Sequence, residues 1–160
     1  MSSLNQILLH RLEQAEIETR VDDVTRTLYS TDASIYQIRP LGVAFPRNVD
    51  QLSAIVELAA QHDTPVIARG AGSGLAGQAI GKGLIVDCSR YLNAIRAIEP
   101  SKNSQALAVV EPGVVYDHLN KAAVAHGLQI GPDPASGSRA TSQGTMARIR
   151  DGAAKGAAWT

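Results

Sequence analysis

Residues 65–78 read PVIARGAGSGLAGQ, so a short apolar run passes directly into a loop that is dense in glycine. The run Pro65–Ala68 predicts a β-strand. In the loop, Gly70, Gly72 and Gly74 permit positive φ angles and carry no Cβ, which allows successive backbone N–H groups to converge on one anion. We therefore predict that the loop binds a pyrophosphate group.

Three alternatives compete with this interpretation. A P-loop would end in Gly-Lys-Ser/Thr, and the loop contains no such sequence. A dinucleotide-binding Rossmann motif fits the glycine spacing of Gly72–Gly77, but the residues that follow, Gln78–Gly83, do not favour the helix that this motif requires. A mobile surface loop is the third alternative, and it would have no need of the ordered strand that precedes it.

Working outward from the loop, hydrophobic periodicity predicts an α+β fold without internal repeats. Helices are expected over Leu4–Ala15, from the N-cap Asn48 to His62, and from Val115 to the C-cap Gly127. The inward residues of the second helix should be Leu52, Ile55, Val56, Ala59 and Ala60. Strands are expected over Leu41–Phe45, Pro65–Ala68, Leu84–Cys88, Ala94–Ile98 and Ala106–Glu111, whereas Val21–Pro40 is turn-rich.

Composition narrows the function classes. Fifteen basic and fifteen acidic residues cancel in this chain of 160, so no long-range positive field favours a nucleic-acid partner. The sequence shows no signal peptide and no membrane span, which predicts a soluble cytoplasmic protein. The single Cys88 and four scattered histidines offer no metal site. We also expect no catalytic base or nucleophile within these residues.

Several ordered motifs resemble the FAD-binding domain of the vanillyl-alcohol oxidase/p-cresol methylhydroxylase (PCMH) type. They are residues 29–34 (YSTDAS), 40–46 (PLGVAFP), 65–78, 84–93 (LIVDCSRYLN), 110–114 (VEPGV), 131–136 (GPDPAS) and 139–141 (RAT). The resemblance implies the first subdomain of that fold, a small mixed sheet flanked by helices, with an incomplete second subdomain. The domain limits it implies are an N-terminal helix over residues 1–23, a partial FAD-binding domain over 24–141 and a loose, divergent tail over 142–160.

The same resemblance implies a set of FAD-binding residues. The loop residues Arg69, Gly70, Ala71, Gly72, Ser73, Gly74 and Gln78 would hold the pyrophosphate, with Ser73 and Gln78 as side-chain donors and Arg69 stabilising the loop or the charge. Residues further along would flank the flavin or its ribityl chain: Pro112, Gly113, Pro132, Asp133, Pro134 and Ser136. Thr141 would belong to a following segment that wraps the cofactor. Ser73 stands where members with covalent flavin carry a histidine, so non-covalent attachment is expected.

Within that family, the chain is most similar to bacterial glycolate oxidase and D-lactate dehydrogenase subunits, which implies oxidation of a 2-hydroxy acid in a full-length relative. After Thr141 the family continues with a Gly-Gly stretch, whereas this chain reads SQGTM over residues 142–146. A truncated or frame-shifted chain without activity is therefore expected. The alternatives are a non-catalytic FAD-binding subunit completed by a partner chain, a remnant, or a PCMH-type enzyme of another reaction, such as reduction of an enolpyruvyl sugar nucleotide.

Overall fold

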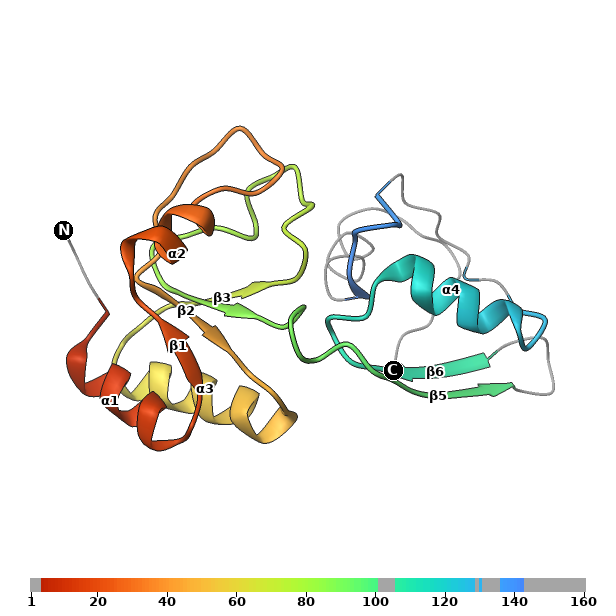
Figure 1. Ribbon diagram of the computed structural model, residues 1–160, viewed down its shortest axis with the longest axis horizontal. Helices are drawn as coiled ribbons and strands as arrows, with labels where there is room; N and C mark the ends of the chain where they lie inside the picture. Colours follow the sequence, from red (N-terminus) through yellow and green to blue (C-terminus); the bar gives the residue numbers. More distant parts are fainter. Residues whose placement is uncertain (1–3, 101–105, 129, 131–135, 143–160) are drawn as a thin grey trace.

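The computed structural model describes residues 4–100, 106–128, 130 and 136–142, which form two lobes (Figure 1). The first lobe, residues 4–87, contains α1 (Gln6–Gln14), β1 (Glu18–Arg20), α2 (Asp23–Leu28), β2 (Gly42–Phe45), α3 (Val49–Gln61), β3 (Val66–Arg69) and β4 (Leu84–Asp87). The second lobe, the described residues from 94 to 142, contains β5 (Ile95–Pro100), β6 (Ala106–Val110) and α4 (Tyr116–Val124). A connector, residues 88–93, joins them.

The first lobe is built on a four-stranded mixed sheet in the order β1-β2-β4-β3. Strands β2 and β3 both run parallel to β4, and β1 is antiparallel to β2. The two central strands, β2 and β4, are buried along their whole length, because both are covered on both faces and contain only apolar residues or glycine apart from Asp87. The carboxyl ends of β2, β3 and β4 consequently lie at one edge of the sheet, which we call the carboxyl edge.

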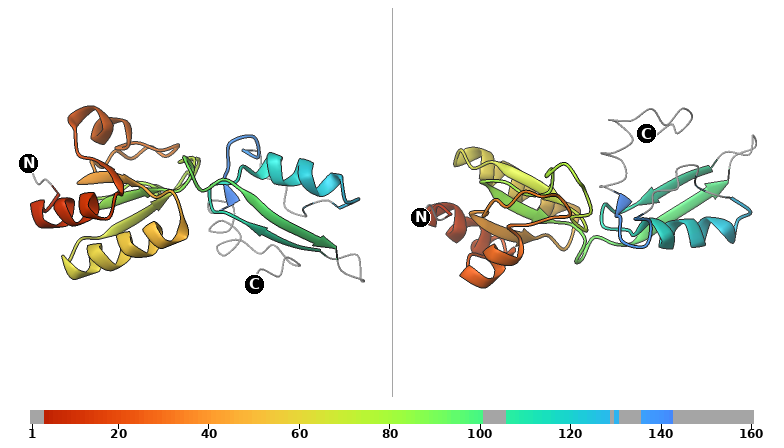
Figure 2. Two further views of the ribbon diagram at one scale, coloured as in Figure 1. Left: turned by 60° about the horizontal axis from the view of Figure 1, so that its bottom comes forward. Right: turned by 90° about the horizontal axis from the view of Figure 1, so that it is seen from above.

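Helices cover both faces of this sheet. On one face, Leu8 and Leu12 of α1 and Ile55 of α3 pack in one cluster with Leu84 and Val86 of β4. On the other face, alternate residues of the same strands form a second cluster that includes Val43, Phe45 and Ile85 and contacts Tyr29 just after α2. The alternation follows from the two-residue period of a strand. Figure 2 shows α2 on the face opposite α1 and α3.

The structure confirms the expected fold class, a small mixed sheet flanked by helices. The Asn48 side chain caps α3 by accepting a hydrogen bond from the Gln51 N–H at 2.8 Å, as predicted. The apolar stripe on that helix is narrower than predicted, since Val56 is 49% exposed and only Ile55 and Ala59 are fully buried. Two elements were not predicted: the strand β1 and the helix α2, which lies within the stretch that we expected to be irregular.

The second lobe is a two-stranded antiparallel sheet, β5 and β6, with α4 on one side (Figure 2). It packs against the connector through Gly113, whose N–H donates to the Leu92 carbonyl at 2.7 Å. A Cβ on Gly113 would lie 2.3 Å from the Cys88 carbonyl oxygen, so this close approach requires glycine. Of the tail predicted to be loose over 142–160, residues 143–160 lie outside the described residues, and Ser142 is buried, with its hydroxyl donating to the Glu111 carbonyl at 2.9 Å. Among the described residues, no helix is long and apolar enough to cross a membrane.

Candidate functional site

The glycine-rich loop leaves β3 at the carboxyl edge of the sheet and returns to β4. Residues 70–83 contain no helix, so the Rossmann alternative is wrong for this chain. Gly72 and Gly77 adopt φ angles of +68° and +76°, which residues with a Cβ rarely tolerate. In open sheets with parallel strands, ligands bind beyond the carboxyl ends of the strands, and this is where the loop lies.

At two glycines of the loop, Gly72 and Gly74, a Cβ would approach the ends of neighbouring side chains to less than 3.0 Å. A Cβ at Gly72 would lie 2.7 Å from Arg69 Nη2, and one at Gly74 would lie 2.6 Å from the Gln78 amide carbon. The Gln78 side-chain oxygen accepts a hydrogen bond from the Ala76 N–H at 3.1 Å, which leaves its amide nitrogen as the donor for a ligand. Glycine at 72 and 74 therefore leaves the loop backbone free of Cβ atoms, and we refer to residues 70–74 as the cradle.

Thr141 brings the second lobe against the start of this cradle. It forms an isolated β-bridge with Val115, and a Cβ on Gly70 would lie 2.0 Å from the Thr141 Oγ1. Thr141 is 2% exposed, and its hydroxyl has no hydrogen-bond partner among the described residues. Leaving a buried hydroxyl without a partner costs about 1–3 kcal/mol, so the position favours a ligand that accepts this hydrogen bond.

Arg69 and Asp32 both reach the far end of the loop. Arg69 Nη1 donates to the Thr31 carbonyl at 2.9 Å and to the Ala79 carbonyl at 3.2 Å. The Ala79 N–H lies 3.4 Å from Asp32 Oδ2, and the Gly72 carbonyl accepts from the Ala33 N–H at 2.9 Å. Burial acts to raise the pKa of Asp32, but hydrogen bonds from Ser34 and Ala79 outweigh it and lower that pKa, so the carboxylate is charged at neutral pH.

The other predicted site residues lie in the second lobe or outside the described residues. Pro112 and Gly113 form the turn after β6, where Gly113 contacts the connector. Ser136 begins a turn in which its carbonyl accepts from the N–H groups of Arg139 and Ala140. Pro132, Asp133 and Pro134 lie outside the described residues. The structure therefore brings together Arg69, the loop and Thr141.

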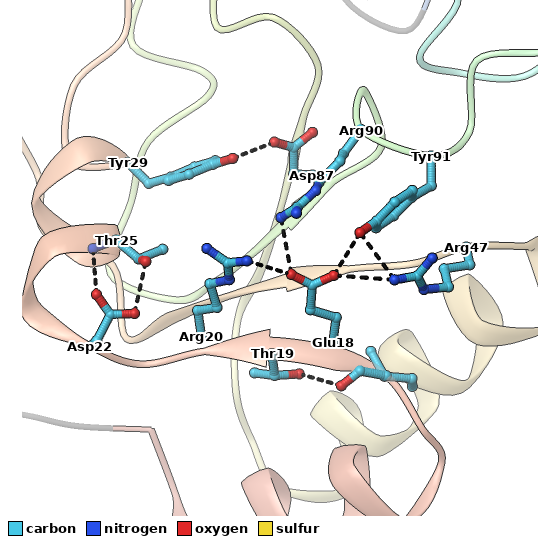
Figure 3. Close-up of polar contacts among 11 residues, drawn as sticks. Glu18, Thr19, Arg20, Asp22, Thr25, Tyr29, Arg47, Asp87, Arg90 and Tyr91 are labelled. Carbon is cyan, nitrogen blue, oxygen red and sulfur yellow. Dashed lines mark hydrogen bonds and ion pairs between the residues drawn. The ribbon is translucent and has the colours of Figure 1, made fainter.

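A buried carboxylate lies beside the loop at the carboxyl edge (Figure 3). Asp87, the last residue of β4, accepts hydrogen bonds from the Tyr29 hydroxyl at 2.6 Å and from the Ser89 hydroxyl at 2.6 Å. Burial, together with the Asp87 carboxylate, raises the pKa of Tyr29, so its hydroxyl stays protonated and donates. The Arg69 guanidinium lies 5.0 Å from the centre of the Tyr29 ring. Asp87 thus anchors Tyr29 and the start of the connector at once.

A cluster of arginines around Glu18 completes the carboxyl edge (Figure 3). Glu18 pairs with Arg20 at 2.8 Å, Arg90 at 3.0 Å and Arg47 at 3.5 Å. A hydrogen bond from the Tyr91 hydroxyl is the largest influence lowering the pKa of Glu18, and Arg20 and Arg90 act in the same direction against burial. Sequence reasoning missed this cluster because its members lie on separate segments. The local signal was the LIVDCSRYLN motif at residues 84–93, which contains Arg90 and Tyr91 but not their partner Glu18.

The fold and the loop define the class of protein: a flavoprotein domain of the PCMH type. The chain belongs to the FAD binding domain family, whose model matches residues 40–152. It is 36% identical to D-2-hydroxyglutarate dehydrogenase of Escherichia coli over 88% of this chain, and 34% identical to glycolate oxidase subunit GlcD of Bacillus subtilis over 69% of it. These matches span 14% and 23% of the two relatives. A structure of p-cresol methylhydroxylase superposes with a TM-score of 0.70, at 19% identity, over 89% of this chain and 30% of that one.

Proposed function

We propose that the loop over Arg69–Gln78, together with Thr141, binds the pyrophosphate of FAD without a covalent link. The backbone of Gly70, Ala71, Gly72, Ser73 and Gly74 would approach the phosphates, with the Ser73 hydroxyl and the Gln78 amide as further donors. Pro112, Gly113, Pro132, Asp133, Pro134 and Ser136 would flank the flavin or ribityl chain. No imidazole is available at Ser73 for a covalent bond to the flavin.

The observation that carries this proposal is the hydroxyl of Thr141. It is buried, has no partner among the described residues and lies against Gly70 at the start of a backbone cradle. A phosphate oxygen in the cradle would accept its hydrogen bond and offset the cost of leaving it unpaired. The residues present therefore fit the cofactor of the family.

We further propose that the chain corresponds to the FAD-binding part, over residues 24–141, of a cytoplasmic flavin-dependent oxidoreductase that acts on a 2-hydroxy acid. The names of the relatives support this substrate class, and FAD would supply the hydride acceptor. Because the chain spans 14% of the dehydrogenase it matches, we expect it to bind FAD but not to turn over D-2-hydroxyglutarate alone. A partner chain would then supply the substrate-binding groups. Turnover with an artificial dye acceptor, at rates above those of Gly72→Val, would contradict this expectation.

The substitution Thr141→Val tests the proposed site. It keeps the shape of the side chain and removes a hydroxyl that has no partner among the described residues, so the free energy of unfolding without cofactor should not fall. The affinity for FAD, measured by flavin fluorescence quenching, should fall about tenfold or more, because a hydrogen bond to a charged group is worth about 1.5–3 kcal/mol. Thr19→Val is the matched control: Thr19 Oγ1 has a partner, the Ile17 carbonyl at 3.2 Å, in a strand far from the loop in sequence.

Gly72→Val is the stronger test of the same site. Valine is disfavoured at a φ of +68°, and its Cβ would push against Arg69. FAD affinity should fall by several orders of magnitude, while the circular dichroism spectrum changes little because the strands do not depend on this position. Gly127→Val is the control, since Gly127 has a φ of +70° and a Cβ there would meet no atom within 4 Å. Equal FAD affinity in wild type and Gly72→Val would place the phosphate site elsewhere.

A further inference from the structure

Two side chains of opposite charge, Asp32 and Arg69, form hydrogen bonds with the residue that follows Gln78 in the loop. Asp32 and Arg69 come from different segments, and both contact the same residue, Ala79. Asp32 accepts from the Ala79 N–H, and Arg69 donates to the Ala79 carbonyl. Ala79 is 7% exposed, and the two bonds to it are part-buried, which reduces competition from water.

Arg69 also contacts two other parts of the chain, the 29–34 segment and Gly72. It is the last residue of β3, and its Nη1 also holds the carbonyl of Thr31, next to Asp32 in the chain. Its Nη2 lies under Gly72, where a Cβ would approach to 2.7 Å. One guanidinium therefore joins the start of the loop, the end of the loop and the 29–34 segment. A lysine ammonium, a point charge on a flexible stem, cannot reproduce this planar arrangement of donors.

We propose that Asp32 and Arg69 are positioning residues that clip Ala79 from both sides and so hold the loop in its anion-binding shape before a ligand arrives. This proposal rests on the proposed function for the ligand, but the clip itself is a property of the free chain. Arg69 then acts through the loop backbone and does not bind the phosphates directly. Holding the cradle in its bound shape reduces the ordering cost of binding, which is how preorganisation raises affinity.

Hydrogen–deuterium exchange on the free full chain tests the clip. In Arg69→Gln, Arg69→Lys and Asp32→Asn, the amide of Ala79 and those of the loop should exchange about tenfold faster or more, as expected when a hydrogen bond to a charged group is lost. Arg11→Gln and Glu13→Gln are the controls, because both residues are exposed on α1. Arg11→Gln removes a positive charge, as Arg69→Gln does, and Glu13→Gln removes a negative charge, as Asp32→Asn does. Unchanged exchange over residues 70–79 in the Arg69 and Asp32 variants would overturn the proposal.

Titrations with ADP and with adenosine, which lacks phosphate, test the positioning role. Arg69→Lys and Arg69→Gln should both lose about tenfold or more in ADP affinity and keep the adenosine affinity of the wild type. Equal losses for both ligands would indicate general destabilisation and overturn the role. Full retention of ADP affinity in Arg69→Lys, with loss in Arg69→Gln, would show that Arg69 acts only as a nearby charge and would also overturn it.

The two experiments separate the two proposals. If the wild-type chain binds neither ADP nor FAD, the proposed function fails, and the exchange data alone decide the clip. If the wild-type chain binds FAD and the exchange rates do not respond to Arg69 or Asp32, the clip fails and the proposed function stands.

Discussion

The two lobes of the molecule differ in how completely they bury their own sheets. In the first lobe, β2 and β4 are central strands whose residues are buried, and apolar clusters lie on both faces. In the second lobe, two strands expose Leu107 and Val109 at 46% and 47%. A two-stranded sheet alone is marginally stable in water. The first lobe can therefore hold the loop in place, whereas the second depends on α4 and on its junction with the first.

The largest effect should come from the centre of the first lobe. Leu84→Ala removes a fully buried side chain from β4 and should lower the free energy of unfolding by about 2–5 kcal/mol, because it leaves a cavity in the main core. Leu107→Ala, on the exposed strand β6, should cost far less. Urea unfolding followed by circular dichroism gives both values. Similar losses at the two positions would remove the contrast between the lobes.

The junction between the lobes should be the next most sensitive region. Gly113→Ala places a Cβ 2.3 Å from the Cys88 carbonyl and 2.5 Å from the Leu92 carbonyl, and both obstacles are backbone. Overpacking of this kind costs about 1–3 kcal/mol. Hydrogen exchange should then rise in β5, β6 and α4 while β2 and β4 stay protected. If the central strands lost protection equally, the lobes would be one cooperative unit.

A smaller loss of stability is expected from removing a helix cap in the first lobe. The Asn48 side chain caps α3, whereas the N-cap of α4, Val115, makes no side-chain capping bond. Asn48→Ala should therefore lower the stability of the first lobe by about 1 kcal/mol, and Asn48→Asp should preserve it, since aspartate caps equally well. The stabilities of both variants and of the wild type can be compared by thermal unfolding. An equal loss in both would mean that the amide is needed for some other contact.

The smallest effect is expected at low pH. The pKa of Glu18 is lowered below its ordinary value of 4.5 in the folded chain. The unfolded state therefore binds this proton first as the pH falls, and the stabilisation by Glu18 is present above the unfolded value and lost below the folded one. Wild type should lose more stability than Glu18→Gln between about pH 5 and pH 3 in denaturant titrations. If stability fell equally with pH in the two proteins, the contacts of Glu18 with the arginines would not contribute to stability.

The sequence predicted well those parts whose signals are local. The glycine loop follows its strand immediately, and Asn48 precedes an apolar period of helical spacing, so both could be located without the structure. The strand β1 could not, because its three residues, Glu18, Thr19 and Arg20, are polar and show no apolar alternation. It is a strand only because it pairs with β2, a contact between distant segments.

The candidate site divides in the same way. The loop was predicted from its own composition, and Thr141 from the resemblance to the family. That Arg69 turns toward Thr31 and Ala79 depends on how the 29–34 segment packs, which no local pattern encodes. The Asp87 contact with Tyr29 joins residues 58 positions apart in the sequence, so no local pattern could predict it either.

The strand order has a consequence for synthesis on the ribosome. β4 is the last of the four strands to be made, yet it lies between β2 and β3, which do not pair with each other. In a nascent chain from which Leu84–Asp87 has not yet emerged, β2 and β3 therefore both lack β4, the strand with which they pair. Such long-range pairing is slow and leaves strand edges open to wrong partners. Because the glycine loop connects β3 to β4, the loop and the completed sheet should form in the same folding step.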